Sequence, residues 1–127
     1  MEFALAITVF MTLLIALIDL ARMAFIFNGI SDAAREIARV TSVHPGTAGL
    51  GTSTETTTAV SHERTLVPGL TVQGYACIDI AGAAVTDDCR SGDWVKVSVR
   101  TSFSPILPVL AAFGPITFNT ASSAKIQ

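Results

Sequence analysis

Charged residues are scarce in this chain, and their scarcity excludes several classes of function. Asp, Glu, Lys and Arg make up only 14% of the 127 residues, whereas soluble domains carry roughly 25%. The net charge is -2 and no stretch is rich in Lys or Arg. We therefore expect no nucleic-acid partner and no strongly acidic ligand.

Residues that carry chemistry are also few. The two histidines, His44 and His62, lie in sequence typical of loops, and no second histidine follows His62-Glu63 at the helical spacing of a zinc motif. The chain has no phosphate-binding glycine loop and no Gly-x-Ser-x-Gly segment. Aspartates between 87 and 93 lack the spacing of a calcium loop and are more typical of turns. We expect no enzyme, no metal, no cofactor and no small-molecule substrate.

Only two cysteines are present, Cys77 and Cys89. An even number in a chain with a membrane-like start favours an oxidised pair outside the cytoplasm. Such a disulfide would contribute roughly 3 kcal/mol in the chain-entropy model. Two buried free thiols are the alternative.

What the sequence has in excess is an apolar run at its start. No charge occurs from Phe3 to Ile18, about 24 Å of helix at 1.5 Å per residue. A bilayer core needs about 20 residues, and the apolar group Met23–Phe27 extends the run. Asp19 and Arg22 interrupt it, but they are three residues apart on one helical face and can pair, which reduces the cost of each charge in apolar surroundings.

Three interpretations of this run compete. A secretory signal peptide would show basic residues before the run and a small-residue cleavage site after it, and neither is present. A plain membrane anchor is possible. A helix that leaves the membrane and packs into a filament core is favoured, because Glu2 directly precedes the run, where a simple anchor gains nothing from a carboxylate.

The helical pattern continues beyond a membrane edge, which also favours the filament interpretation. One face is apolar and the opposite face is charged, as in an amphipathic helix. The helix should run to about Thr41 and end at His44-Pro45-Gly46, with a soft point at Asn28-Gly29. We assign 1–42 to this helix. Its apolar face contains Ile26, Ile30, Ala33, Ala34, Ile37 and Ala38.

The remainder, 43–127, predicts a small antiparallel sheet. Residues 46–61 are small and polar and are interpreted as an exposed loop, bare or carrying O-linked sugar. Strands are expected over 70–80, 93–103 and 116–126, because β-forming residues dominate and Val95, Val97 and Val99 alternate with polar residues. The prolines between the last two strands predict a crossing with a helical turn at 109–113. The sheet should cover the amphipathic half of the helix, giving an α+β fold.

Both ends of the chain carry a recognisable pattern. The start MEFALAITVFMTLLIALIDLARMAF, the segment AAREIAR at 33–39, and the C-terminal portion from Val95 onward together resemble the TadE-like pilin family of tight-adherence (Flp-type) pilus systems. Residues 46–70 add nothing to this resemblance.

The resemblance implies a type IV-like pilin route. The implied partners are other copies of the chain and other pilins, a prepilin peptidase, an assembly machinery, and the inner membrane before assembly; the implied location is an extracellular pilus. In such pilins the acidic residue usually lies fifth in the mature chain, whereas here it is second. The absent basic leader fits a mature or trimmed chain, or processing differs.

Glu2 has a physical role that can be stated without the family. A carboxylate at the end of an apolar helix is costly in lipid unless it is neutralised, although the helix dipole favours it there. The α-amino group of Met1 on a neighbouring subunit is a suitable partner, so Glu2 and Met1 are predicted to set inter-subunit register. Local capping and snorkelling to headgroups are the alternatives.

The sequence therefore predicts a structural pilin-like subunit that polymerises through its apolar helix. The rival from another class is a single-pass accessory or sensor protein of the pilus assembly system with a periplasmic β-domain. A secreted binding module is a third hypothesis.

Overall fold

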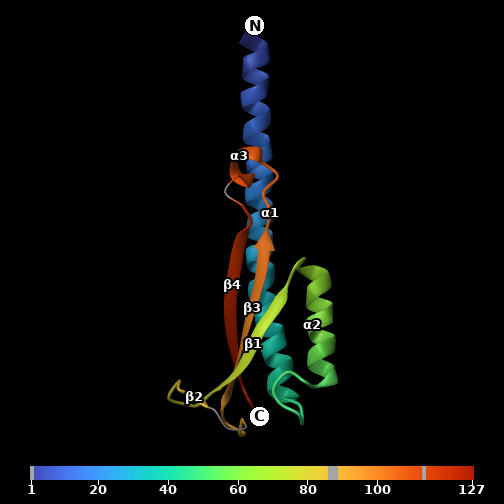
Figure 1. Ribbon diagram of the computed structural model, residues 1–127, viewed down its shortest axis with the longest axis vertical. Coiled ribbons are helices and arrows are strands. Elements are labelled where there is room, and N and C mark those ends of the chain that lie inside the picture. Colours follow the sequence, from blue (N-terminus) through green and yellow to red (C-terminus); the bar gives the residue numbers. More distant parts are fainter. Residues whose placement is uncertain (1, 86–88, 113) are drawn as a thin grey trace.

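A single helix forms the long axis of the molecule, and a curved sheet wraps one side of its second half (Figure 1). The computed structural model describes residues 2–85, 89–112 and 114–127, with the backbone alone at residues 2, 108 and 109. The fold is α+β, as predicted. In chain order the elements are α1 (Glu2–Val43), α2 (Thr54–Leu66), β1 (Thr71–Ile78), β2 (Ala84–Val85), β3 (Trp94–Phe103), α3 (Pro108–Ala111) and β4 (Ile116–Lys125).

The helix α1 ends two residues beyond the predicted position. It passes through Asn28-Gly29 without a break, and after Val43 the chain turns at Pro45, which cannot continue the helix. Gly29 has a packing role instead of being a soft point: a Cβ at this position would lie 3.0 Å from the Val67 side chain. The missing side chain therefore lets the turn after α2 approach α1 closely.

The sheet has the strand order β2-β1-β3-β4, and every pair is antiparallel. The predicted strands are confirmed, and the crossing between β3 and β4 contains the expected helical turn as α3. In the central strand β3, Val95, Val97 and Val99 are at most 1% exposed, while Lys96 and Arg100 face solvent. This period of two places all three valines on the face that meets α1.

The core lies between this valine face and the predicted apolar face of α1. The core positions of the helix are alternately large and small, since Ile30 and Ile37 are separated by Ala33 and Ala34, and all four are buried. The small alanines let the backbone of the sheet come close to the helix, while the isoleucines pack in one cluster with the buried valines of β3.

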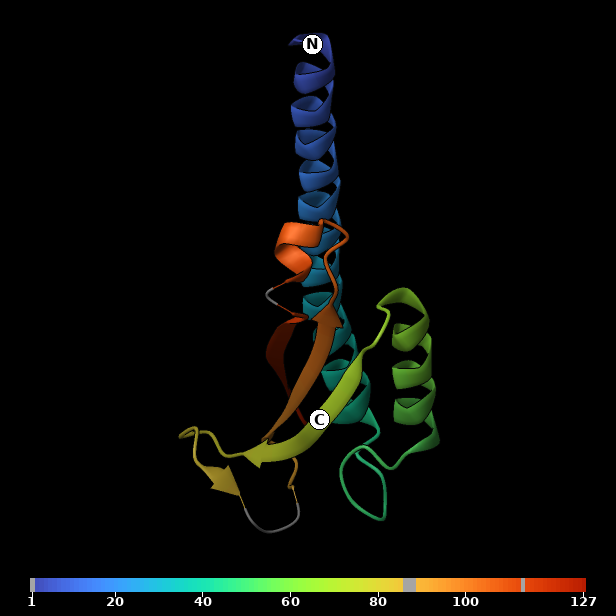
Figure 2. The ribbon, with the colours of Figure 1, turned by 45° about the horizontal axis from the view of Figure 1, so that its top comes forward.

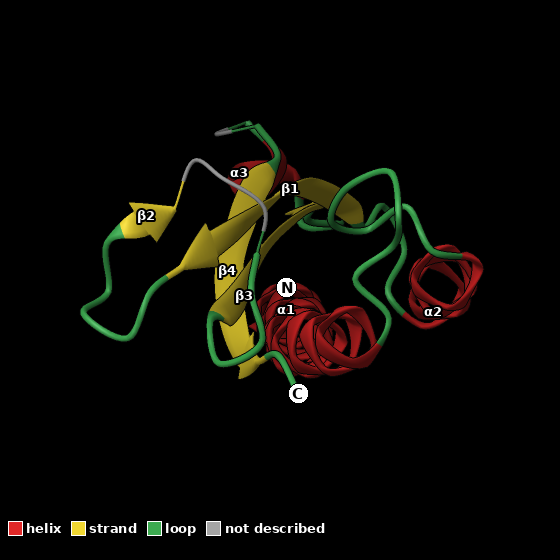
Figure 3. Ribbon diagram, turned by 90° about the horizontal axis from the view of Figure 1, so that it is seen from below, coloured by secondary structure: helices red, strands yellow, loops and turns green. Residues whose placement is uncertain are grey.

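The prediction of a loop over 46–61 is wrong for its second half, because α2 begins at Thr54. Ser53 caps this helix: its Oγ accepts the Thr56 backbone N–H at 3.1 Å. Thr56, Val60 and Glu63 turn inward at helical spacing, and α2 packs beside α1 (Figures 1 and 3). The threonine-rich composition disfavours a helix by propensity, and the cap together with tertiary packing overrides that preference.

Replacing Ile37 with Ala should lower the free energy of unfolding by about 2–5 kcal/mol, because the lost side chain leaves a cavity between α1 and the sheet. Ile37 is 0% exposed, whereas Val43 on the same helix is 48% exposed. Denaturant unfolding of the full chain in detergent micelles, followed by circular dichroism, measures the change. Val43→Ala is the matched control, and equal effects of the two variants would contradict this assignment of the core.

Candidate functional site: the exposed half of the long helix

The first half of α1 projects from the rest of the molecule (Figures 1 and 2). We call residues 3–18 the rod. Its large apolar side chains are exposed on all sides of the helix, with Phe3 at 80% and Leu13 at 64% exposed. The polar side chains of Thr8 and Thr12 donate their hydroxyl hydrogens to the carbonyls of Leu5 and Thr8. The rod therefore presents an apolar surface whose few polar groups are satisfied within the helix.

The rod has the properties of a membrane span or of a helix that packs among other helices. Among the described residues, α1 is the one helix that is long enough and apolar enough to cross a bilayer. Its most apolar segment is almost entirely exposed. A soluble core helix of the same composition would be buried inside its own domain. The rod is thus a large apolar surface that the described residues of the chain leave uncovered.

Asp19 marks the end of the rod and is 1% exposed. One carboxylate oxygen, Oδ2, accepts the backbone N–H groups of Ile106 and Leu107 at 2.9 and 2.8 Å. The other, Oδ1, accepts a hydrogen bond from Arg22 Nη1 at 3.2 Å. A buried carboxylate with three donors is electrostatically satisfied, so Asp19 ties the connection between β3 and α3 to the helix.

Arg22 lies between this carboxylate and the end of β3. Its guanidinium carbon is 5.3 Å from the centre of the Phe103 ring, a distance typical of a cation–π contact. The side chain is 44% exposed. The predicted helix pair of Asp19 and Arg22 is thus part of a larger contact that joins the helix to the sheet.

Sequence reasoning did not find the contact of Asp19 with Ile106 and Leu107. The available signal was the segment Pro105-Ile-Leu-Pro108. Two prolines prevent its intervening N–H groups from joining a regular sheet or helix, so those donors need an acceptor elsewhere. Only the tertiary fold brings a residue some 87 positions earlier within hydrogen-bonding distance.

The predicted register residues are not settled by the structure. Met1 and the side chain of Glu2 lie outside the described residues. Their pairing between subunits stays a prediction.

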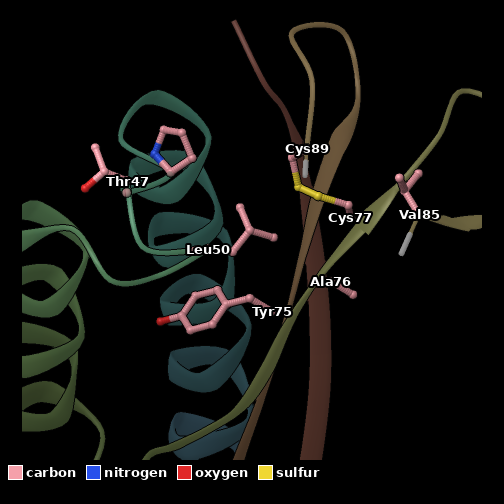
Figure 4. Close-up of a pocket in the computed structure, with 10 residues that line it drawn as sticks. Thr47, Leu50, Tyr75, Ala76, Cys77, Val85 and Cys89 are labelled. Atoms are coloured by element: carbon pink, nitrogen blue, oxygen red, sulfur yellow. A yellow bond between two sulfur atoms is a disulfide. The ribbon is translucent and has the colours of Figure 1, made fainter. Parts of the chain in front are cut away.

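Cys77 and Cys89 form a disulfide, with their Cα atoms 5.7 Å apart. It ties β1 to the segment that precedes β3, at the end of the molecule far from the rod (Figures 2 and 4). Both thiols are consumed in this bond, so neither is available for chemistry.

Beside the disulfide lies an open cavity of about 620 Å³ (Figure 4). Its titratable side chain is Tyr75, whose pKa is raised by burial and lowered to a lesser extent by Arg64. The other lining groups include Leu50, Thr47 and the glycines of the loop after α1. No nucleophile and base are brought together here among the lining residues.

The remaining candidates from the sequence do not meet in space where the structure describes them. Within the ranges that the structure describes, no three His, Cys, Asp or Glu side chains could jointly hold a metal ion. His44 follows the end of α1, and His62 lies on α2 beside Glu63. Asp79 and Asp93 cap turns by accepting backbone N–H groups. Asp87 and Asp88 lie outside the described residues.

Asp19→Ala should lower the free energy of unfolding by about 3 kcal/mol, because two buried N–H groups lose their acceptor and Arg22 loses its counter-charge. Hydrogen exchange at the amides of Ile106 and Leu107 should accelerate, and mass spectrometry of the full chain in micelles measures it. The control is Asp32→Ala, since Asp32 and its partner Arg35 are both exposed and should matter little. Unchanged exchange at both amides would contradict the role of Asp19.

Comparison with known proteins gives one match. Residues 1–39 fit the family model described as TadE: TadE-like protein. No curated protein matches the chain, and no solved structure matches it. The matched segment contains the rod, Asp19, Arg22 and most of the helical face that packs on the sheet.

The match agrees with the pattern that the sequence showed at its start, and with an apolar helix that suits a membrane-anchored or surface-pilus protein. The family is structural and related to the Tad pilus. Through its N-terminal helix, over residues 1–39, the chain is similar to the TadE-like proteins.

Proposed function

We propose that this chain is a structural pilin-like subunit that polymerises through the rod into an extracellular type IV-like Tad pilus used for surface attachment. The observation that carries this proposal is the division of one continuous helix. Its second half packs with α2 and the sheet into a folded unit, which we call the head. Its first half projects from the head with its apolar side chains exposed. A surface that is apolar on all sides can be covered on all sides in a bundle of identical helices.

Burial of the rod supplies the favourable term for association. Taking apolar surface out of water contributes roughly 25 cal/mol per Å², and the gain is smaller when the surface leaves lipid, where packing between side chains drives association. Extraction from the membrane therefore requires work from an assembly motor. The chain itself has to supply only a complementary surface.

The attachment of the head to the rod supports a filament more than a plain anchor. Asp19 and Arg22 hold the β3–α3 connection and Phe103 against the helix at the base of the rod. No flexible linker lies between head and rod, because α1 is continuous from Glu2 to Val43. A fixed angle between head and core helix is needed for a regular helical array, whereas an anchored sensor domain does not need it.

Glu2 is proposed to set the register between subunits by pairing with the α-amino group of Met1 on a neighbouring copy. A carboxylate that enters an apolar bundle is stabilised when a cation lies beside it. The chain offers no Lys or Arg before Arg22, so the amine is the nearest cation in the sequence.

The proposed partners follow from this route. They are copies of the same chain and other pilins in the filament, a prepilin peptidase and the assembly machinery before it, and the inner membrane as the site of the precursor. Neither nucleic acid nor a small-molecule substrate has a part in the proposal.

Glu2→Gln should reduce the yield and length of filaments in cells that express this pilin, because the carboxylate that pairs with the neighbouring amine is lost. Shearing the cells and imaging the released material by electron microscopy measures both quantities. Glu2→Asp keeps the charge and is the control. Normal filaments from Glu2→Gln would refute the register role.

The same preparation tests the polymer itself. The unaltered chain should be recovered in sheared filaments. Its recovery in membranes alone would refute the proposal and favour the single-pass accessory or sensor protein instead.

A further inference from the structure

The connection between β3 and β4 lies against the helix at the base of the rod. It leaves the sheet after Phe103, meets Asp19 through the N–H groups of Ile106 and Leu107, and forms α3 alongside α1 on the side nearer the N-terminus (Figures 1 and 2). Its position along α1 is therefore set by two hydrogen bonds. We call the described residues 104–112 of this connection the wedge.

We propose that the wedge inserts into the lipid leaflet on the head side of the membrane while the subunit is in its precursor state. The proposal rests on the membrane-inserted precursor of the proposed function. It adds a second membrane contact beside the helix, made by a segment some ninety positions later in the chain.

The depth of the wedge follows from the length of the rod. A bilayer core of about 30 Å takes up about 20 helical residues. If Phe3 lies at one edge of that core, the opposite edge falls a few residues beyond Asp19. The amides bonded to Asp19 then lie just inside this edge, and α3, which lies toward the rod, is at the level of the acyl chains.

The composition of the wedge suits that depth. No charged residue occurs between Arg100 and Lys125. Ile106 is 60% exposed and Leu110 is 37% exposed, so the wedge directs apolar side chains away from its own protein. Exposed apolar groups beside a membrane span extend the surface that lipid covers.

Five backbone N–H groups of the connection have acceptors within the protein, which suits surroundings without water. At membrane depth each N–H group needs a partner within the protein. Pro105, Pro108 and Pro115 have no N–H to satisfy. The N–H groups of Ile106 and Leu107 donate to Asp19, and those of Leu110, Ala111 and Gly114 donate to carbonyls within the connection, at 3.0, 2.8 and 3.0 Å.

Asp19 fits the same interpretation. A carboxylate near the edge of the hydrocarbon is tolerated when it is enclosed and neutralised. The wedge covers it and supplies two donors, and Arg22 supplies the opposite charge and a third donor. The wedge therefore lowers the free-energy cost of placing Asp19, the charge that interrupts the apolar run of α1, next to lipid.

The test places a tryptophan in the wedge. The full chain carries Trp94→Phe, which removes its own tryptophan, together with Leu110→Trp or, in a second variant, Ile106→Trp. Each protein is reconstituted at one chain per nanodisc in phosphatidylcholine brominated on its acyl chains. We expect the wedge tryptophan to lose most of its emission to the bromines and to emit at shorter wavelength than in water.

Two controls make the outcome decisive. Leu13→Trp reports on the rod, where the side chain is exposed in the isolated chain. Ile80→Trp reports on a site 90% exposed in the turn that joins β1 to β2. The strand β2 lies at the end of the molecule away from the rod (Figure 2). Quenching at the rod and wedge but not at position 80 supports the proposal. Quenching at the rod alone overturns it and leaves the proposed function intact.

The remaining outcomes are equally informative. Absence of quenching at the rod itself would refute the membrane-inserted precursor, and with it both proposals. A further outcome is a wedge tryptophan that emits as in water and escapes quenching in nanodiscs, yet emits at shorter wavelength in filaments. That result would show that the wedge contacts a second copy of the chain, which also overturns lipid insertion. Circular dichroism of each variant confirms that the head has folded.

Discussion

A single helix must satisfy two different surroundings, and the rest of the structure follows from that constraint. Over its second half, α1 presents Ile30, Ala34 and Ile37 to the valine face of β3, and the exclusion of water from this contact holds the head together. Over the rod, the described part of the chain leaves the large apolar side chains exposed. Because the helix is continuous, the head cannot move independently of the exposed rod.

The transition between the two surroundings falls at Asp19. An unpaired carboxylate at this position would be unfavourable for two reasons. The head buries it, and the rod next to it is apolar. Its three donors come from both elements: Arg22 from the helix and two backbone amides from the connection after β3. The interaction that neutralises the charge is therefore also the one that fixes the head at the base of the rod.

Much of the fold could be predicted from periodicity. The apolar face of α1 and the alternation of Val95, Val97 and Val99 depend only on local spacing, which the sequence displays directly. The helix α2 could not be predicted in the same way, because its threonines disfavour a helix and its stability comes from the Ser53 cap and from Val60 packing toward α1. The rod could be predicted because its apolar residues are consecutive in the sequence. The hydrogen bonds from Ile106 and Leu107 to Asp19 could not, because they join residues far apart in the chain.

By itself the sequence determined the apolar helix, the strands, the cysteines available for pairing and the family pattern at the start, because each is carried by neighbouring residues or by composition. Tertiary structure decided which half of the helix is covered, where Asp19 finds its donors, and that the β3–β4 connection lies beside the rod. These depend on contacts between residues far apart in the chain. Such contacts form only when burial of the common core brings the segments together.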